Sequence, residues 1–207
     1  MKLKKQLSPG FTLIELLTVI AIIGILAAIL IPTVGAAKNS AKKAKTKAQF
    51  SQWAASVELF RQEYGYYPEI GQAGKLVDPT KFLAALTAYD YKGAAVTAGA
   101  ANGNTKLLHF YSASDSEILK DGSGNPKNEL IDAFGNSTIA VYVDSSLSGL
   151  VKPVATKLQT GNSVIGFTAN TNSPTAAAFP SDGVRAGAVF YSAGNGNSSN
   201  DYVLSWQ

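Results

Sequence analysis

The first part of the chain is dominated by one long apolar run. It covers residues 11–31, and Glu15 is its only charged side chain. As a helix, a run of this length measures roughly 32 Å at ~1.5 Å per residue, which matches a hydrocarbon core of about 30 Å. The pattern therefore predicts a transmembrane helix. A carboxylate is expensive inside such a segment, which makes Glu15 a candidate functional group.

A second helical pattern follows over residues 32–65. Its apolar side chains recur at alternating spacings of three and four residues, which places them on one face of a helix. They are Phe50, Trp53, Val57, Phe60 and Tyr64. This amphipathic stem is predicted to supply the spine of the core, and Gly65, with Pro68 close behind, is predicted to end it. Pro32 lacks an N–H group and Gly24 weakens a helix, so we expect a kink or a local opening between them.

The remaining residues, 66–207, predict a globular head of the α+β class. Asp78-Pro79-Thr80 is a helix start, with Asp78 as the N-cap of a short helix over about 81–89. Short runs rich in β-branched and aromatic residues then predict strands. These runs are 107–111, 138–143, 164–168 and 188–191, and 93–104 and 170–182 are predicted loops. Short connections favour an antiparallel sheet packed against the long helix.

Charge and composition exclude several classes of function. The net charge is +4, but the part beyond Gly65 holds nine basic and eleven acidic side chains, which does not favour a dedicated nucleic-acid binder. Cysteine is absent, which excludes disulfides and thiol chemistry. The single histidine, His109, lies in an apolar run, where a structural role is expected. No phosphate loop, paired-carboxylate spacing or zinc motif is present, so an enzyme is not expected.

The junction before the apolar run offers three interpretations. A short leader carrying Lys2, Lys4 and Lys5 ends at Gly10, directly before Phe11. In the first, the leader is removed at Gly10 and the apolar segment is kept. In the second, an ordinary signal peptide is cut near residues 34–36, which would release a soluble protein. In the third, the segment is a plain membrane anchor, in which Glu15 has no partner.

The sequence Gly10-Phe11-Thr12-Leu13-Ile14-Glu15, between basic and apolar residues, closely resembles the processing signal of type IV pilins and type II secretion pseudopilins. The resemblance implies cleavage between Gly10 and Phe11 by a prepilin peptidase, followed by methylation of Phe11. It also implies that Glu15 pairs with the Phe11 amine of a neighbouring subunit during assembly. The chain would then consist of a leader (1–10), a transmembrane and assembly helix (11–31), a stem (32–65) and a head (66–207). The resemblance allows the helix to melt between Gly24 and Pro32 in a filament.

Two head segments resemble the major pseudopilin of type II secretion. Residues 131–136 are similar to its Asp-Pro-Trp-Gly segment, with alanine and phenylalanine replacing proline and tryptophan, and residues 190–206 are similar to its terminal loop. The resemblance implies a structural subunit, a homopolymer served by prepilin peptidase, an inner-membrane assembly platform and minor pilins or pseudopilins. The chain would cross the inner membrane once with its head in the periplasm. The alternatives are a type IV pilus subunit for adhesion, motility or DNA uptake, and a membrane-anchored extracytoplasmic binding domain.

Major pseudopilins often hold calcium in the C-terminal loop, and the resemblance extends that expectation to this chain. Calcium binds six to eight oxygen ligands. The candidate ligands are Asn195, Asn197, Asn200 and Asp201, of which only Asp201 is charged. A polar turn without metal is the alternative, and no other cofactor is expected.

Overall fold

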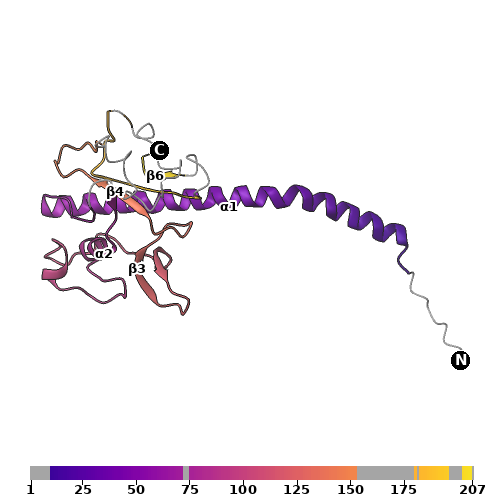
Figure 1. The fold of residues 1–207 in the computed structure, drawn as a ribbon, viewed down its shortest axis with the longest axis horizontal. Helices are drawn as coiled ribbons and strands as arrows, with labels where there is room; N and C mark the ends of the chain where they lie inside the picture. Colours follow the sequence, from indigo (N-terminus) through magenta and orange to yellow (C-terminus); the bar gives the residue numbers. More distant parts are fainter. Residues whose placement is uncertain (1–9, 72–74, 153–179, 181, 196–201, 207) are drawn as a thin grey trace, which may run out of the picture. The chain divides into compact units, whose positions relative to one another are not determined.

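The computed structural model describes residues 10–71, 75–152, 180, 182–195 and 202–206. The chain divides into two compact units, residues 1–41 and 42–207. A single helix, α1 (Leu13–Tyr64, 52 residues), contributes to both. The second unit also holds a short helix and two antiparallel sheets, so the α+β arrangement of a type IV pilin-like protein is confirmed (Figure 1).

Helix α1 ends where the sequence predicted. Gly65 adopts φ +79°, and its N–H donates to the Arg61 carbonyl at 2.7 Å. The positions predicted to break the helix, Gly24 and Pro32, both lie inside it without interruption. The Thr33 hydroxyl donates to the carbonyls of Ile29 (3.4 Å) and Leu30 (2.9 Å), one turn earlier. Melting between Gly24 and Pro32 in a filament stays a prediction.

Most of the strands belong to one sheet of the head, in the order β1-β4-β5-β6. Its members are β1 (Lys75–Leu76), β4 (Ile139–Val143), β5 (Ala188–Ser192) and β6 (Val203–Leu204), and β2 (Ile118–Lys120) pairs separately with β3 (Pro126–Leu130). All pairings are antiparallel, and β4 and β5 are in register from Ile139↔Ser192 to Val143↔Ala188. The predicted strands 138–143 and 188–191 are therefore confirmed.

The core of the head forms along the predicted face of α1. Phe50, Trp53, Val57 and Phe60 are fully buried, and Tyr64 is half-buried at the edge. The Trp53 ring lies 4.7 Å from that of Phe82 and 5.4 Å from that of Phe190. Because side chains alternate across a strand, β4 and β5 also supply a second cluster on the other face of the sheet. That cluster contains Ala140, Tyr142, Val189, Tyr191, Tyr202 and Leu204.

The predicted strand over 107–111 is wrong. In the structure this segment is irregular, Leu107 has φ 53°, and the N–H groups of Phe110 and Tyr111 both donate to the Leu86 carbonyl at 2.9 Å. Leu86 lies near the end of α2 (Pro79–Thr87), where helix carbonyls lack internal partners. The end of α2 thus accepts the N–H groups that this segment would have donated to a neighbouring strand in a sheet.

The sequence predicted the N-cap of helix α2 correctly, but the predicted bounds of the helix differ from those in the structure. Asp78 caps it as expected, accepting the Lys81 N–H at 3.1 Å, but the helix begins at Pro79 and ends at Thr87 because Ala88 turns left-handed at φ 59°. The predicted loop 93–104 contains a short 3-10 helix, Ala98–Ala100, and a second one, Asp115–Glu117, precedes β2. The predicted strand 164–168 and most of the predicted loop 170–182 lie outside the described residues.

A buried turn at Asp132 connects the sheet to the C-terminal loop. Asp132 is 2% exposed and accepts hydrogen bonds from Phe134 N (2.8 Å), Asn136 N (2.9 Å), Asn136 Nδ2 (3.1 Å) and Ser192 Oγ (2.7 Å). The Asn136 amide also donates to the Gly194 carbonyl at 2.7 Å. In this cysteine-free chain, hydrogen bonds therefore hold the start of the C-terminal loop.

The same turn contacts the stem part of α1. Ala133 N donates to the Thr46 hydroxyl at 3.2 Å, and the Gln49 amide donates to the Ile131 carbonyl at 2.9 Å. Both Thr46 and Gln49 are buried polar residues of the helix. Residues 131–136, which resemble a pseudopilin segment, thus link helix, sheet and loop.

Candidate functional site

The site predicted from the sequence is the start of α1, where Thr12 and Glu15 form a reciprocal cap. The Glu15 Oε2 atom accepts hydrogen bonds from Thr12 N (2.8 Å) and Thr12 Oγ1 (2.6 Å), and Glu15 N donates back to Thr12 Oγ1 at 3.3 Å. The Thr12 carbonyl accepts the first helical bond, from Leu16 N at 3.2 Å. This is a capping box, with threonine at the N-cap and glutamate three residues later.

The cap explains how a carboxylate is accommodated in this segment of the monomer. Glu15 lies in the first turn of α1, where the positive end of the helix dipole favours a negative charge. Both bonds from Thr12 end on Oε2, so Oε1 carries no hydrogen bond within the described residues. Glu15 was predicted as the functional group, but Thr12 was missed. The T-x-x-E spacing before an apolar run was a signal that could have identified it.

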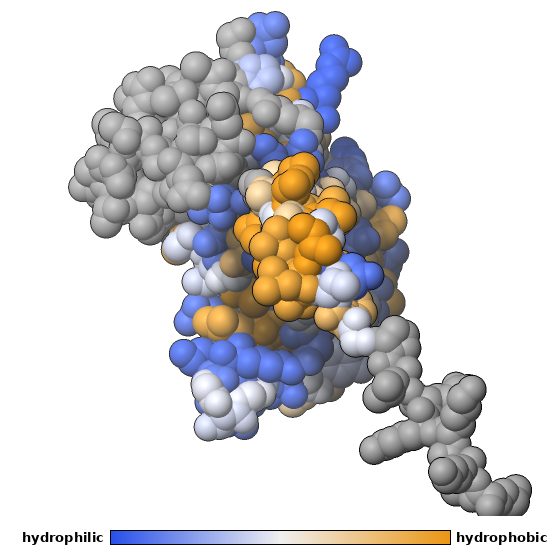
Figure 2. All heavy atoms as spheres, turned by 90° about the vertical axis from the view of Figure 1, so that its right-hand side faces the viewer, coloured by the Kyte–Doolittle hydropathy of each residue, from blue (hydrophilic) through white to orange (hydrophobic). Residues whose placement is uncertain are grey.

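The apolar side chains after the cap are exposed in the described part of the first unit. Leu13 is 80% exposed, Ile20 is 59% exposed and Ile31 is 74% exposed, and the apolar residues between them are similar. Figure 2 views this end of α1, and it presents a continuous hydrophobic surface. Within the described residues, α1 is the one helix long and apolar enough to cross a membrane, by length and composition. A helix that is apolar on all sides requires lipid or other protein around it.

Gly10 and Phe11 lie directly before the cap. Both are exposed, and Phe11 is 81% exposed. A Cβ atom built on Gly10 would meet nothing within 4 Å, and its φ is not in the left-handed region. The described part of the chain therefore gives no steric or backbone reason for glycine at this position. A requirement for glycine here would come from something that binds the segment, such as a peptidase.

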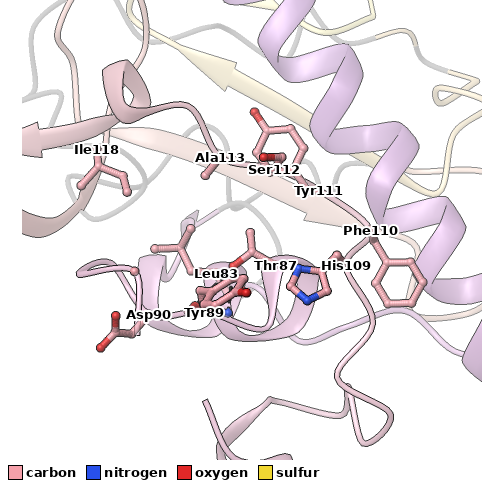
Figure 3. A pocket seen from close by; sticks show the side chains of 11 residues that line it. Leu83, Thr87, Tyr89, Asp90, His109, Phe110, Tyr111, Ser112, Ala113 and Ile118 are labelled. Atoms are coloured by element: carbon pink, nitrogen blue, oxygen red, sulfur yellow. Dashed lines mark hydrogen bonds between the residues drawn. The ribbon is translucent and has the colours of Figure 1, made fainter. Parts of the chain in front are cut away.

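His109, predicted to be structural, is exposed rather than buried in a strand. Its ring lies 5.1 Å from that of Tyr89, and both residues line an open cavity of about 560 Å³ beside α2 (Figure 3). The Asp90 carboxylate at the same cavity accepts hydrogen bonds from the backbone N–H groups of Lys92 and Ala94, both at 2.8 Å. These bonds stabilise the turn that follows Asp90. The described residues contain no cluster of three or more His, Cys, Asp or Glu side chains.

The predicted calcium ligands fall largely outside the described residues. Only Asn195 is described, and it is exposed in a turn. Asn197, Asn200 and Asp201 lie outside the described ranges. Calcium binding by this loop stays a prediction.

Comparison with known proteins identifies the segment that contains the cap. Residues 8–31 match the family model of the prokaryotic N-terminal methylation motif. The chain carries the N-terminal signature of type IV pilins and pseudopilins. A 70-residue stretch is 33% identical to the type II secretion system core protein G of Pseudomonas aeruginosa, covering 34% of this chain and 49% of that protein. The chain thus matches about half the length of this relative. No solved structure matches the chain.

Proposed function

We propose that this chain is a structural subunit of a pilus-like filament, and not an enzyme. The observation that carries the proposal is the start of α1, where an exposed apolar segment contains a single charged side chain, Glu15, which is held by a cap and has one oxygen without a hydrogen bond in the described residues. Lipid would surround this helix before assembly. In the filament, the helices of neighbouring subunits would surround one another.

Glu15 would set the register between subunits. Cleavage after Gly10 creates a new amine at Phe11. The Glu15 Oε1 atom carries no hydrogen bond in the described residues, and it would accept one from the Phe11 amine of a neighbouring subunit. A carboxylate left unpaired in an apolar environment is costly, and removing one partner of a buried pair leaves the other charge uncompensated. Misaligned subunits would therefore be disfavoured.

Within this class we propose a major pseudopilin of type II secretion. The similarity to a type II secretion core protein supports this choice over a surface pilus subunit for adhesion, motility or DNA uptake. The chain would be anchored in the inner membrane with its head in the periplasm. Its partners would be prepilin peptidase, an inner-membrane assembly platform, minor pseudopilins and further copies of itself. Deleting its gene should leave exported proteins in the periplasm, whereas loss of surface filaments alone would favour the pilus alternative.

The charge of Glu15 can be tested separately from its capping role. Glutamine serves as well as glutamate in a capping box, so Glu15→Gln keeps the cap and removes the charge, whereas Thr12→Ala removes the cap and keeps the charge. We expect Glu15→Gln to be inserted and cleaved but to yield few sheared filaments per membrane-bound subunit. Thr12→Ala should assemble close to wild type. Normal filament yield from Glu15→Gln would show that the carboxylate charge does not direct assembly.

A further inference from the structure

The loop after β4 brings together four oxygen-bearing groups, one of which is a buried carboxylate. Its sequence is Asp144-Ser145-Ser146-Leu147-Ser148-Gly149-Leu150, and Asp144 is 4% exposed. The loop belongs to the head and is remote in sequence from the assembly segment. A binding role for it is therefore independent of the proposed function.

The oxygens of this loop are spaced like the ligands of a cation. Asp144 Oδ1 lies 2.6 Å from Ser146 Oγ and 3.2 Å from Ser148 Oγ. Ser146 Oγ lies 3.1 Å from Ser148 Oγ, which in turn lies 3.2 Å from the Leu150 carbonyl oxygen. Calcium binds oxygens at about 2.3–2.6 Å, so adjacent ligands in its shell are roughly 3 Å apart. Four of the required oxygens are therefore already close to that arrangement.

The backbone adopts the turn that such a loop needs. Gly149 has φ +73°, and its N–H donates to Asp144 Oδ2 at 2.6 Å. Counting Asp144 as position one, the side-chain oxygens lie at positions one, three and five, glycine is at six and the carbonyl oxygen is at seven. This is the order of ligands in the first half of an EF-hand calcium loop. Serine hydroxyls replace the carboxylates usual at positions three and five, and β4 replaces the preceding helix.

Both ends of the loop are fixed to the sheet region. Asp144 N donates to the Gly187 carbonyl at 2.8 Å, and Val151 forms a two-way bridge with Val184 at 2.8 and 2.9 Å. Val151 is 3% exposed. The ligand oxygens are thus held in place by anchored backbone on either side, which lowers the ordering cost of binding.

The charge and access of the site also suit a metal ion. Burial raises the pKa of Asp144, but hydrogen bonds from Ser146, Gly149 and Ser148 together lower it by more. The net shift of the pKa is downward, so the carboxylate is ionised at neutral pH. The loop borders an open cavity of about 350 Å³, from which water can complete the coordination shell. Lys152 lines the same cavity, and its positive charge would reduce the affinity.

We propose that residues 144–150 form a low-affinity calcium site, with ligands from Asp144, Ser146, Ser148 and the Leu150 carbonyl. An all-oxygen set of ligands favours calcium over transition metals, and over magnesium, which demands a stricter geometry. With a single carboxylate, we expect a Kd of about 10⁻⁴–10⁻³ M, the range of extracellular calcium modules. Without metal the same oxygens form the hydrogen-bonded turn described above.

The test uses the full chain in detergent and terbium as a calcium probe, detected by tyrosine-sensitised luminescence and displaced by calcium. Ser146→Ala and Ser148→Ala should each weaken terbium and calcium binding about tenfold or more, because each removes one of few ligands. Ser145→Ala, which changes the neighbouring hydroxyl, is the matched control and should leave the affinity unchanged. Asp201→Ala removes the charged ligand of the site predicted in the C-terminal loop, and it should leave the affinity of the Asp144 loop unchanged.

A gain-of-function variant completes the design. Ser146→Asp adds a second carboxylate at position three and should strengthen calcium binding by about tenfold, because affinity rises with ligand charge. This result does not depend on whether the alanine variants fold. The proposal is overturned if Ser146→Asp leaves the affinity unchanged, if folded Ser146→Ala and Ser148→Ala bind like wild type, or if only Asp201→Ala abolishes binding.

Discussion

Replacing Asp132 with alanine should destabilise the head far more than removing a similar aspartate elsewhere. Asp132 and Asp121 form the same turn, in which the carboxylate accepts the N–H groups of the second and fourth residues ahead and the amide of an asparagine. Asp121 receives Ser123 N (2.8 Å), Asn125 N (2.9 Å) and Asn125 Nδ2 (3.2 Å). The difference lies in burial, because Asp132 is 2% exposed and also binds the buried Ser192 hydroxyl.

The expected loss of stability comes from the groups left behind. Asp132→Ala leaves the buried Ser192 Oγ and the half-buried donors Phe134 N, Asn136 N and Asn136 Nδ2 without their acceptor. Leaving a buried donor without its acceptor costs about 1–3 kcal/mol, and because several donors are affected we expect a total loss of about 3–5 kcal/mol. For a unit of this size we expect Tm to fall by roughly 10 °C. At the exposed turn, water replaces the carboxylate, so Asp121→Ala should destabilise the head far less.

The assay is thermal unfolding of the full chain in detergent, followed by near-UV circular dichroism, which reports the packing of the aromatic side chains of the head. Asp132→Ala and Asp121→Ala are compared with wild type under the same conditions. Equal Tm shifts for the two variants, or a shift below about 3 °C for Asp132→Ala, would show that burial does not make this carboxylate structural.

Two further predictions concern the head. Burial raises the pKa of Glu117 despite hydrogen bonds from Tyr111 and Trp53, so its folded state binds a proton more tightly and its contribution to stability is lost as pH rises from about 4 through the raised pKa. The free energy of unfolding of wild type, measured with urea, should therefore fall as pH rises relative to that of Glu117→Gln. A difference in this free energy that stays constant with pH would contradict the prediction. A Cβ on Gly71 would lie 2.8 Å from the Leu76 carbonyl oxygen, whereas one on Gly122 would meet nothing within 4 Å. Gly71→Ala should cost about 1–3 kcal/mol in the same unfolding assay, and an equal effect of Gly122→Ala would count against the contact.

The helices and central strands were predictable because their patterns are local and complete. The face that includes Phe50, Trp53 and Phe60 repeats over several turns, and β4 and β5 are continuous runs of β-branched, aromatic and small residues. In contrast, β3 reads Pro-Lys-Asn-Glu-Leu and only its last residue is buried, so its pairing with β2 leaves no hydrophobic alternation in the sequence. The segment 107–111 has a strand-like composition, but the partner of its N–H groups is the end of a helix distant in sequence.

The candidate sites differ in the same way. Gly10, Phe11 and Glu15 are visible at a sharp change from basic to apolar residues, and no tertiary contact is needed to find them. Thr12 requires reading the cap as a pair. The calcium loop at Asp144 contains mostly neutral ligands, so its sequence resembles an ordinary polar turn until the distances between its oxygens are known.

The proposed assembly of this chain into a filament requires that the apolar segment is retained and that the mature chain begins at Phe11. The intact mass of the protein extracted from its native membrane tests this requirement without any intermediate step. We expect a chain that starts at Phe11 and carries one added methyl group, and we expect Gly10→Val to remain at the mass of the full precursor. A wild-type mass corresponding to cleavage after Ala36, or to the uncut chain, would contradict the proposed function.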